Sequence, residues 1–141
     1  MNIDSINNGI VIDHIQAGKA MEIYHFLGLE NLDCSVAIIK NVRSKKSGKK
    51  DIIKIDNDID VDMDVLGYID TNITANIIKD GKIIEKKHME LPEKIVNIIK
   101  CQNPRCITSI ERELDQIFNL TDKENKIYRC KYCEMQAKEQ L

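Results

Sequence analysis

The first ninety residues alternate between two hydrophobic patterns. Short runs rich in Ile and Val, such as residues 9–15, are typical of strands. Apolar residues that recur every three or four positions, as they do after Gly18, are typical of a helix. In chain order the pattern predicts a strand over 9–15, a helix that continues to Leu29, strands over 35–42 and 51–56, a short helix over 61–69, and strands over 72–78 and 82–88.

The polar segments between these elements carry turn signals. Residues 44–50 form a lysine-rich connection with one glycine, and Asp80-Gly81 between two Ile-containing strands is a strong hairpin signal. Residues 57–60 offer N-cap candidates for the second helix. The order β-α-β-β-α-β, followed by one hairpin strand, predicts an α+β fold of the ferredoxin-like, split βαβ type. Its antiparallel sheet would have helices on one face. The other face could be solvated, but the Ile-rich strands favour a ligand or another subunit as its cover.

Leu91-Pro92 interrupts the hydrophobic pattern, and we expect a domain boundary there. The two predicted domains are residues 1–92 and residues 93–141. The second domain is too small to bury much of a core, and pieces of that size usually need a metal or disulfides. We expect it to be a small, zinc-ribbon-like β domain.

Four cysteines in the second domain are spaced as metal ligands. Cys101 and Cys106 form a C-x4-C arm, and Cys130 and Cys133 form a C-x2-C arm. Four thiolates suit one structural Zn²⁺ per chain, because they close its tetrahedron and leave no position for water. Two disulfides or unrelated buried cysteines are the alternative, which a reducing compartment disfavours. Cys34 stands alone, and we assign it no role.

Charge and composition indicate where in the cell the protein is found and which kinds of partner it binds. The net charge is −2 at pH 7, so the chain lacks the basic surface that nucleic-acid binding usually needs. It also lacks a long apolar run and the basic, apolar start of a signal peptide. We therefore expect a cytoplasmic protein with neither nucleic acid nor membrane as a partner.

Sequence motifs of catalysis are missing, whereas one strand end suggests anion binding. The sequence has no Walker loop, no G-x-G-x-x-G and no spacing that supports a nucleophile with its base. Asp13-His14 ends the first Ile-rich strand, and a sheet could bring Lys54 and Lys86 close to it. Convergent cations suit a polyphosphate and a carboxylate suits ribose hydroxyls. Ordinary solvated surface charge is the competing interpretation.

Two further functions fit parts of this pattern. A stand-alone zinc-ribbon adaptor for protein interaction, including a transcription-associated one, would use the first domain only to dimerise. A small metal-dependent enzyme would need an open zinc position. The four-cysteine set argues against the enzyme, and the charge balance of the second domain argues against direct reading of nucleic acid.

The residues quoted so far, taken together, resemble one known family. Residues 9–15, residues 50–56, Leu91-Pro92 and the four-cysteine set look like the regulatory chain of aspartate carbamoyltransferase, in order and over nearly the whole chain. The resemblance implies a non-catalytic subunit in pyrimidine biosynthesis, with an N-terminal allosteric domain that binds CTP or ATP and forms a homodimer. It also implies a C-terminal zinc domain that docks on the catalytic chain, so that regulatory dimers bridge catalytic trimers.

The family resemblance also implies site residues, position by position. Those for the nucleotide are Asp4, Ile6, Val11, Asp13, His14, Lys54, Asn76, Ile78, Ile83 and Lys86, with His14 and Lys86 facing phosphates. Those for the catalytic-chain interface are Asn103, Arg105, Lys131, Tyr132 and Glu134. Two positions depart from the family pattern: Asp4 stands in place of the longer Glu, and Gly81 stands in place of an aromatic residue. Both departures bear on base preference.

Overall fold

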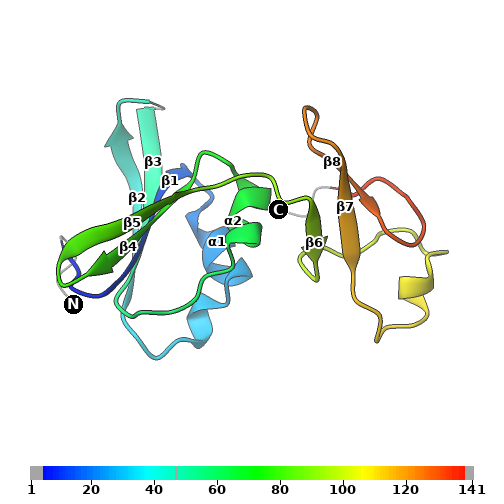
Figure 1. The fold of residues 1–141 in the computed structure, drawn as a ribbon, viewed down its shortest axis with the longest axis horizontal. Coiled ribbons are helices and arrows are strands. Elements are labelled where there is room, and N and C mark those ends of the chain that lie inside the picture. Colours follow the sequence, from blue (N-terminus) through cyan, green and yellow to red (C-terminus); the bar gives the residue numbers. More distant parts are fainter. Residues whose placement is uncertain (1–4, 47, 139–141) are drawn as a thin grey trace. The chain divides into compact units, whose positions relative to one another are not determined.

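The computed structural model describes residues 5–46 and 48–138, and it divides the chain into two compact units (Figure 1). Unit 1 spans residues 1–90 and unit 2 spans residues 91–141. Asp4, Ser47 and the last three residues lie outside the described part of the chain.

Unit 1 contains the predicted alternation of strands and helices. Its elements are β1 (Gly9–Gln16), α1 (Ala20–Phe26), a 3₁₀ turn η1 (Leu29–Asn31), β2 (Val36–Ser44), β3 (Gly48–Ile55), α2 (Met63–Ile69), β4 (Thr74–Lys79) and β5 (Lys82–His88). Asp80 and Gly81 both have positive φ, 52° and 76°, as a type I′ hairpin turn between β4 and β5 requires. The Asp-Gly hairpin prediction is confirmed.

The five described strands of unit 1 form one antiparallel sheet in the order β2-β3-β1-β4-β5. In this order β1 lies between β3 and β4, and β3 lies between β1 and β2. Each βαβ unit therefore receives a strand from the other, which is the split βαβ arrangement. The predicted α+β, ferredoxin-like fold is confirmed.

The hydrophobic core of unit 1 lies between the sheet and its helices, which cover the same face of the sheet (Figure 1). Alternate residues of the central strands, including Ile10 and Ile12 in β1 and Ile53 and Ile55 in β3, are at most 2% exposed. They pack with Ala20, Ile23 and Leu66 of the helices, among others. The period of two along these strands leaves the intervening residues on the opposite face.

The element boundaries differ from the sequence prediction in three places. Helix α1 ends at Phe26, and Gly28 with φ 65° turns the chain into η1, because glycine tolerates the left-handed conformation that ends a helix. Helix α2 takes Asp62 as its N-cap, after the predicted window 57–60, and the Asp62 carboxylate accepts the N–H of Asp64. Much of the lysine-rich connection 44–50 is paired strand, with Ser44 opposite Gly48.

Unit 2 is a small β domain. Its three described strands, β6 (Lys94–Val96), β7 (Ile117–Asp122) and β8 (Ile127–Cys130), pair antiparallel in that order, and a 3₁₀ turn η2 (Ile107–Ser109) precedes β7. Phe118, Ile95 and Ile99 are buried. Within the described residues, no helix is both long and apolar enough to span a membrane.

Candidate anion-binding face and metal centre

The sheet face opposite the helices carries a row of side chains across four strands. Val11 of β1 pairs with Lys54 of β3 on one side and with Asn76 of β4 on the other. Asn76 in turn pairs with Lys86 of β5. Directly opposed residues of an antiparallel sheet point to the same face. The register therefore brings these four predicted nucleotide residues together.

This row lies between two ends of the same face. At one end Gly9 pairs with Ile78, and Ile78 pairs with Ile83 of β5. At the other end Asp13 pairs with Thr74, and Thr74 pairs with His88. Because a strand rises about 3.3 Å per residue, roughly 13 Å separate Gly9 from Asp13 along β1. The face is long enough to contact different parts of one extended ligand at its two ends.

A β-bulge shapes the end of the face at Asp13 and Thr74. The register of β1 shifts between Ile12 and Ile15, and His14 has φ 76°, a conformation uncommon outside glycine. Asp13 Oδ1 accepts the N–H of His14 at 2.8 Å and pairs with Lys50 Nζ at 2.9 Å. The Nδ1 atom of His14 lies 2.9 Å from Thr74 Oγ1. The bulge thus holds the His14 ring on the same face as Asp13 and Thr74.

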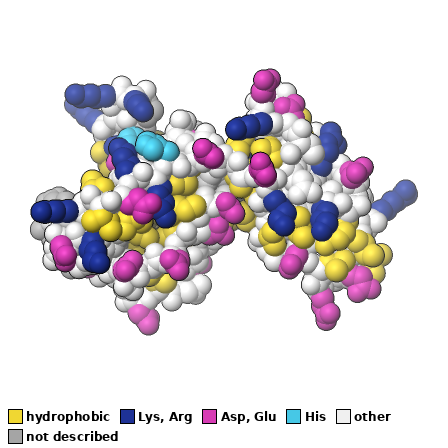
Figure 2. All heavy atoms as spheres, in the orientation of Figure 1, with side chains coloured by type: hydrophobic (Ala, Val, Ile, Leu, Met, Phe, Trp, Pro, Cys, Tyr) yellow, Lys and Arg dark blue, Asp and Glu magenta, His cyan; other side chains and the backbone are white. Residues whose placement is uncertain are grey.

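An open depression of about 1110 Å³ adjoins this bulge. It is lined by His14, Gln16, Ala17, Lys46, Gly48, Lys49, Asp70, Thr71, Asn72, Thr74, Lys86 and His88. Figure 2 shows histidine side chains beside lysine or arginine side chains at one end of unit 1. Three lysines and two histidines face one acidic residue in this lining, so the depression suits an anionic ligand.

The charges around His14 affect its own ionisation. Burial lowers the pKa of His14 below 6.5, and Lys50, Lys86 and Lys46 lower it further, against the opposing effect of Asp13. The three lysines thus disfavour a further positive charge on His14, as expected where several cations converge.

The depression contains only part of the predicted nucleotide set. His14 and Lys86 line it directly, whereas Asp13 does not line it but accepts the N–H of His14. Val11, Lys54 and Asn76 lie in the row, and Ile78 and Ile83 lie at the far end of the face, beside Gly9. Ile6 is buried, at 6% exposure. Asp4 lies outside the described residues.

Sequence reasoning missed several residues of the depression. Lys46 and Lys49 belong to the segment interpreted as a polar connection, and His88 lies at the end of a predicted strand without an assigned role. The run of four lysines between residues 45 and 50 was the available signal, because a hairpin end can carry such a run over a neighbouring strand. Nothing in the local sequence of Thr74 marked it as the partner of His14.

Asn76 carries an unsatisfied polar atom in the middle of this face. Its side chain is 8% exposed, and the Oδ1 atom has no hydrogen-bond partner among the described residues. A buried acceptor without a partner costs free energy of about 1–3 kcal/mol. A ligand with an N–H or amino group could satisfy it.

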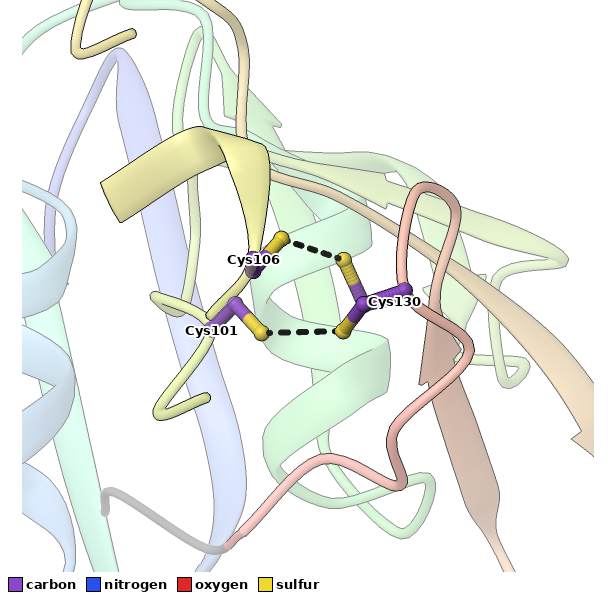
Figure 3. Close-up of side chains that lie close together, drawn as sticks. Cys101, Cys106 and Cys130 are labelled. Carbon is purple, nitrogen blue, oxygen red and sulfur yellow. Dashed lines mark hydrogen bonds between the residues drawn. The ribbon is translucent and has the colours of Figure 1, made fainter. Parts of the chain in front are cut away.

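Unit 2 brings its four cysteines together. Cys101 and Cys106 lie in the loop before and at the start of η2, Cys130 ends β8, and Cys133 follows in a turn. The Sγ atoms of Cys101 and Cys133 are 3.5 Å apart, those of Cys106 and Cys130 are 3.7 Å apart, and all four lie within 4.8 Å of one another. Figure 3 shows the sulfur atoms of Cys101, Cys106 and Cys130 turned toward one another.

These distances fit one tetrahedral ion. Zn–S bonds of about 2.3 Å place neighbouring sulfurs of a tetrahedron roughly 3.8 Å apart, close to both observed pairs. A disulfide would need about 2.05 Å, and all five cysteines are free. The alternative of two disulfides is therefore wrong for this structure. Four thiolates also leave no position for water, as in structural sites.

Hydrogen bonds hold the cysteine loops in place. The Thr108 hydroxyl donates to Cys106 Sγ at 3.2 Å, and the Ser109 hydroxyl donates to the carbonyl of Cys106 at 2.7 Å. Glu134, with φ 62°, donates its N–H to the carbonyl of Cys130, which closes the C-x2-C turn. These bonds orient the ligands before the metal binds.

The thiols differ in their tendency to ionise. Burial raises the pKa of Cys101 to about 12 and also raises that of Cys130. Burial acts in the same direction on Cys133, but hydrogen bonds, led by the Asn103 side chain, outweigh it and lower its pKa to about 7. Four thiolates at neutral pH therefore require a cation among them, and the ligand set fits a metal dication.

The predicted interface residues lie in the loops that carry the cysteines. Asn103 and Arg105 belong to the C-x4-C arm, and Lys131, Tyr132 and Glu134 belong to or follow the C-x2-C arm. Lys131 and Glu134 border a depression of about 400 Å³ that Arg129 and Asn119 also line. Sequence reasoning missed exposed apolar residues of the same unit, namely Val96, Ile107, Ile110, Leu114 and Met135. Figure 2 shows hydrophobic side chains grouped on its surface.

Comparison with known proteins gives one consistent result over both units. Residues 1–90 match the family model "Aspartate carbamoyltransferase regulatory chain, allosteric domain", and residues 93–140 match "Aspartate carbamoyltransferase regulatory chain, metal binding domain". The chain is 56% identical over 134 residues to the aspartate carbamoyltransferase regulatory chain of Clostridium botulinum strain Hall, covering 95% of this chain and 92% of that one. It is 56% identical over 135 residues to that of Clostridium tetani, covering 95% and 94%, and 45% identical over 138 residues to that of Bifidobacterium longum, covering 98% and 99%.

Proposed function

The chain belongs to the family of aspartate carbamoyltransferase regulatory chains, and we propose that it binds CTP and ATP on the open face of unit 1. As a member it is a non-catalytic chain with an allosteric domain and a metal-binding domain, which acts in the regulation of pyrimidine biosynthesis and associates with a catalytic chain. The observation that carries the nucleotide proposal is the cationic depression beside His14 and Lys86.

The triphosphate would occupy that depression. Lys46, Lys49 and Lys86 offer ammonium groups to phosphate oxygens, and a protonated His14 would add another donor. Asp13 stands next to this end and is available to ribose hydroxyls as well as to Lys50. The ligand's negative charge would then relieve the mutual repulsion of the cations.

The base and ribose would lie along the row of Val11, Lys54, Asn76 and Lys86, toward the end of the face at Gly9. Val11, Ile78 and Ile83 offer apolar contacts, and Lys54 reaches the same face. The buried Oδ1 of Asn76 would receive a hydrogen bond from the ligand. The roles of Asp4 and Ile6 at the base remain part of this proposal.

The metal of unit 2 would be one structural Zn²⁺. Its ligands would be Cys101, Cys106, Cys130 and Cys133, and the ion would supply the cross-link that a unit with so small a core lacks. The rigid loops would then present Asn103, Arg105, Lys131, Tyr132 and Glu134 to the catalytic chain. Exposed Ile107 and Ile110, which follow Cys106 directly, would add apolar contact there.

We also propose that unit 1 forms a homodimer, so that two regulatory chains bridge catalytic trimers in the cytoplasm. Strand β2 is an edge of the sheet, and its first four residues are apolar and only partly buried. Such an edge exposes unpaired backbone groups and is a ready surface for a second strand. The free cysteines fit a reducing cytoplasm.

Reconstitution with a catalytic chain tests this function. The purified chain is mixed with an aspartate carbamoyltransferase catalytic trimer, and the products are weighed by sedimentation. CTP or ATP should then change the apparent affinity of the complex for aspartate, because each nucleotide binds the two states of the complex unequally. The expected change is about 5- to 150-fold, the usual range of allosteric coupling.

The catalytic trimer alone is the control, and its saturation curve should not respond to either nucleotide. Either sign of the shift supports the proposal. No complex, or a complex that binds neither CTP nor ATP, would contradict it.

The pKa of His14 predicts how nucleotide affinity depends on pH. The free site lowers this pKa below 6.5, and a bound polyphosphate would raise it again by stabilising the imidazolium. Binding should therefore take up a proton, and CTP affinity should rise as pH falls from the bound-state pKa to the free-state pKa. Below the free-state pKa the gain should stop.

Calorimetry between pH 5.5 and pH 8 in two buffers of different ionisation heat measures this uptake. The His14→Gln variant corrects for His88, which also lines the depression, and for the phosphate's own titration. Equal proton uptake by the wild type and His14→Gln would show that His14 does not contact the phosphates.

A further inference from the structure

Asp51 is a fully buried carboxylate that the proposed contacts do not use. It lies in β3 at 0% exposure, and it is the only charged side chain among the buried residues of the described chain. A buried carboxylate is costly unless hydrogen bonds compensate for lost water. Its bonds therefore indicate what it stabilises.

Both oxygens of Asp51 accept backbone N–H groups from two other segments. Oδ2 accepts from Gly18 at 3.0 Å, in the turn between β1 and α1, and from Ala20 at 3.3 Å, at the start of α1. Oδ1 accepts from Asn41 at 3.0 Å, in edge strand β2. One side chain thus ties the β1–α1 turn and β2 to the central strand β3.

The backbone is irregular at two of the three residues whose N–H groups Asp51 accepts. Gly18 has φ 97° and Asn41 has φ 60°, and the register of β2 against β3 shifts between Ile39 and Val42. The residue opposite Asp51 in β1 is Ile15, which directly follows the bulge at His14. These conformations are less favourable than regular strand for most residues, so the carboxylate bonds help to keep them populated.

The same segments form the wall of the cationic depression. Gln16 and Ala17 line it just before Gly18, and Lys49 lines it two residues before Asp51. Lys50, the neighbour of Asp51, pairs with Asp13 at the bulge. The carboxylate therefore sits behind the wall that presents the cations, and its own oxygens are occupied by the backbone.

We propose that Asp51 is a positioning residue for the phosphate end of the nucleotide site, and that its three hydrogen bonds join this end to edge strand β2. This inference rests on the proposed function. Without these bonds the turn and the bulges would relax, and a triphosphate would have to order them on binding. A nucleoside without phosphates places nothing in the depression, although its ribose can still reach Asp13, so its binding should depend little on Asp51.

The Asp51→Asn variant of the full-length, zinc-loaded chain tests this role. An amide places an N–H₂ group against backbone N–H donors, so at least one of the three bonds is lost. CTP binding, measured by calorimetry, should weaken about tenfold or more because a charge-assisted network is broken. Cytidine binding, measured by ligand-observed NMR titration, should stay within about twofold, since cytidine has no phosphate to place in the depression.

Asp62→Asn is the matched control. It makes the same carboxylate-to-amide change at the N-cap of α2, where Asp62 accepts the N–H of Asp64. It should leave the affinities for CTP and cytidine unchanged. A general loss of stability would affect both ligands, whereas a positioning role affects the triphosphate alone.

Hydrogen exchange of the wild-type chain gives a second measurement, which decides the matter if Asp51→Asn does not fold. CTP should slow exchange of the Gly18, Ala20 and Asn41 amides, with cytidine having no such effect. Exchange at these amides that CTP leaves unchanged, or Asp51→Asn binding CTP as the wild type does, or losing both ligands equally, would overturn the positioning role. A wild-type chain that binds no CTP would instead overturn the proposed function, and the inference with it.

Discussion

Replacing Cys130 by serine is expected to unfold unit 2 and to abolish association with the catalytic chain. Cys130 is 1% exposed and its sulfur is one of four within 4.8 Å. Structural zinc contributes an apparent 10–16 kcal/mol, roughly, to the folding of small metal domains. The whole stability of a domain is only about 5–15 kcal/mol, so unit 2 should not survive the loss of its metal.

Unit 1 should remain folded in the same variant, because its core is separate from the four-cysteine cluster. Amide exchange resolves the two units: the Phe118 amide in β7 should lose protection, and the Ile53 amide in β3 should keep it. Sedimentation with a catalytic trimer should then show free components only. Removing the metal from the wild type with a chelator or a mercurial should reproduce both results.

Cys34→Ser is the matched control for this prediction. Cys34 is a half-buried cysteine of unit 1 and does not belong to the cluster. This variant should assemble normally and should bind one zinc per chain. A Cys130→Ser chain that keeps β7 protected and still assembles would contradict the structural role of the metal.

Replacing Lys86 by alanine is expected to weaken triphosphate binding about 10- to 100-fold, since a charge-assisted hydrogen bond contributes roughly 1.5–3 kcal/mol. Lys86 lines the depression with His14, and its charge acts on the pKa of that histidine. Fold stability should change little, because the Lys86 side chain is exposed and lies on an edge strand. Calorimetric titration with CTP and ATP measures the loss.

Lys82→Ala removes the same charge from the same strand, but Lys82 does not line the depression. Its effect should stay within about twofold and vanish at high salt, because it acts only through screened long-range attraction. Lys54→Ala should also weaken nucleotide binding, because Lys54 lies on the part of the face proposed for the base and ribose. Unchanged affinity in both Lys54→Ala and Lys86→Ala would remove the nucleotide site from this face.

Much of the fold followed from local patterns in the sequence. Short Ile-rich runs in β1 and β3 indicated strands, and Asp80-Gly81 indicated the hairpin turn that its positive φ values confirm. The two cysteine arms indicated one metal site, because thiolates at short spacing form a chelating pair. In each case the relevant residues are neighbours along the chain, so the pattern itself contains the geometry.

The contacts of the anion site did not follow from such patterns. Lys46, Lys49 and His88 meet His14 only because β3 and β4 flank β1 in the sheet and β5 follows β4. The assignment of individual nucleotide residues came from the resemblance to the family. Strand order and register are set by long-range pairing, which local periodicity does not encode.

The sequence by itself determined the order of elements and the two cysteine arms of the metal-binding domain, since each depends on residue type and spacing over short distances. The tertiary structure alone decided the bulge that turns His14 toward Thr74, the convergence of lysines from a hairpin end, and the burial of Asp51 beneath three backbone N–H groups. Those features arise where segments distant in the sequence meet. Their free energies depend on which polar groups are buried next to one another, and local sequence does not specify this.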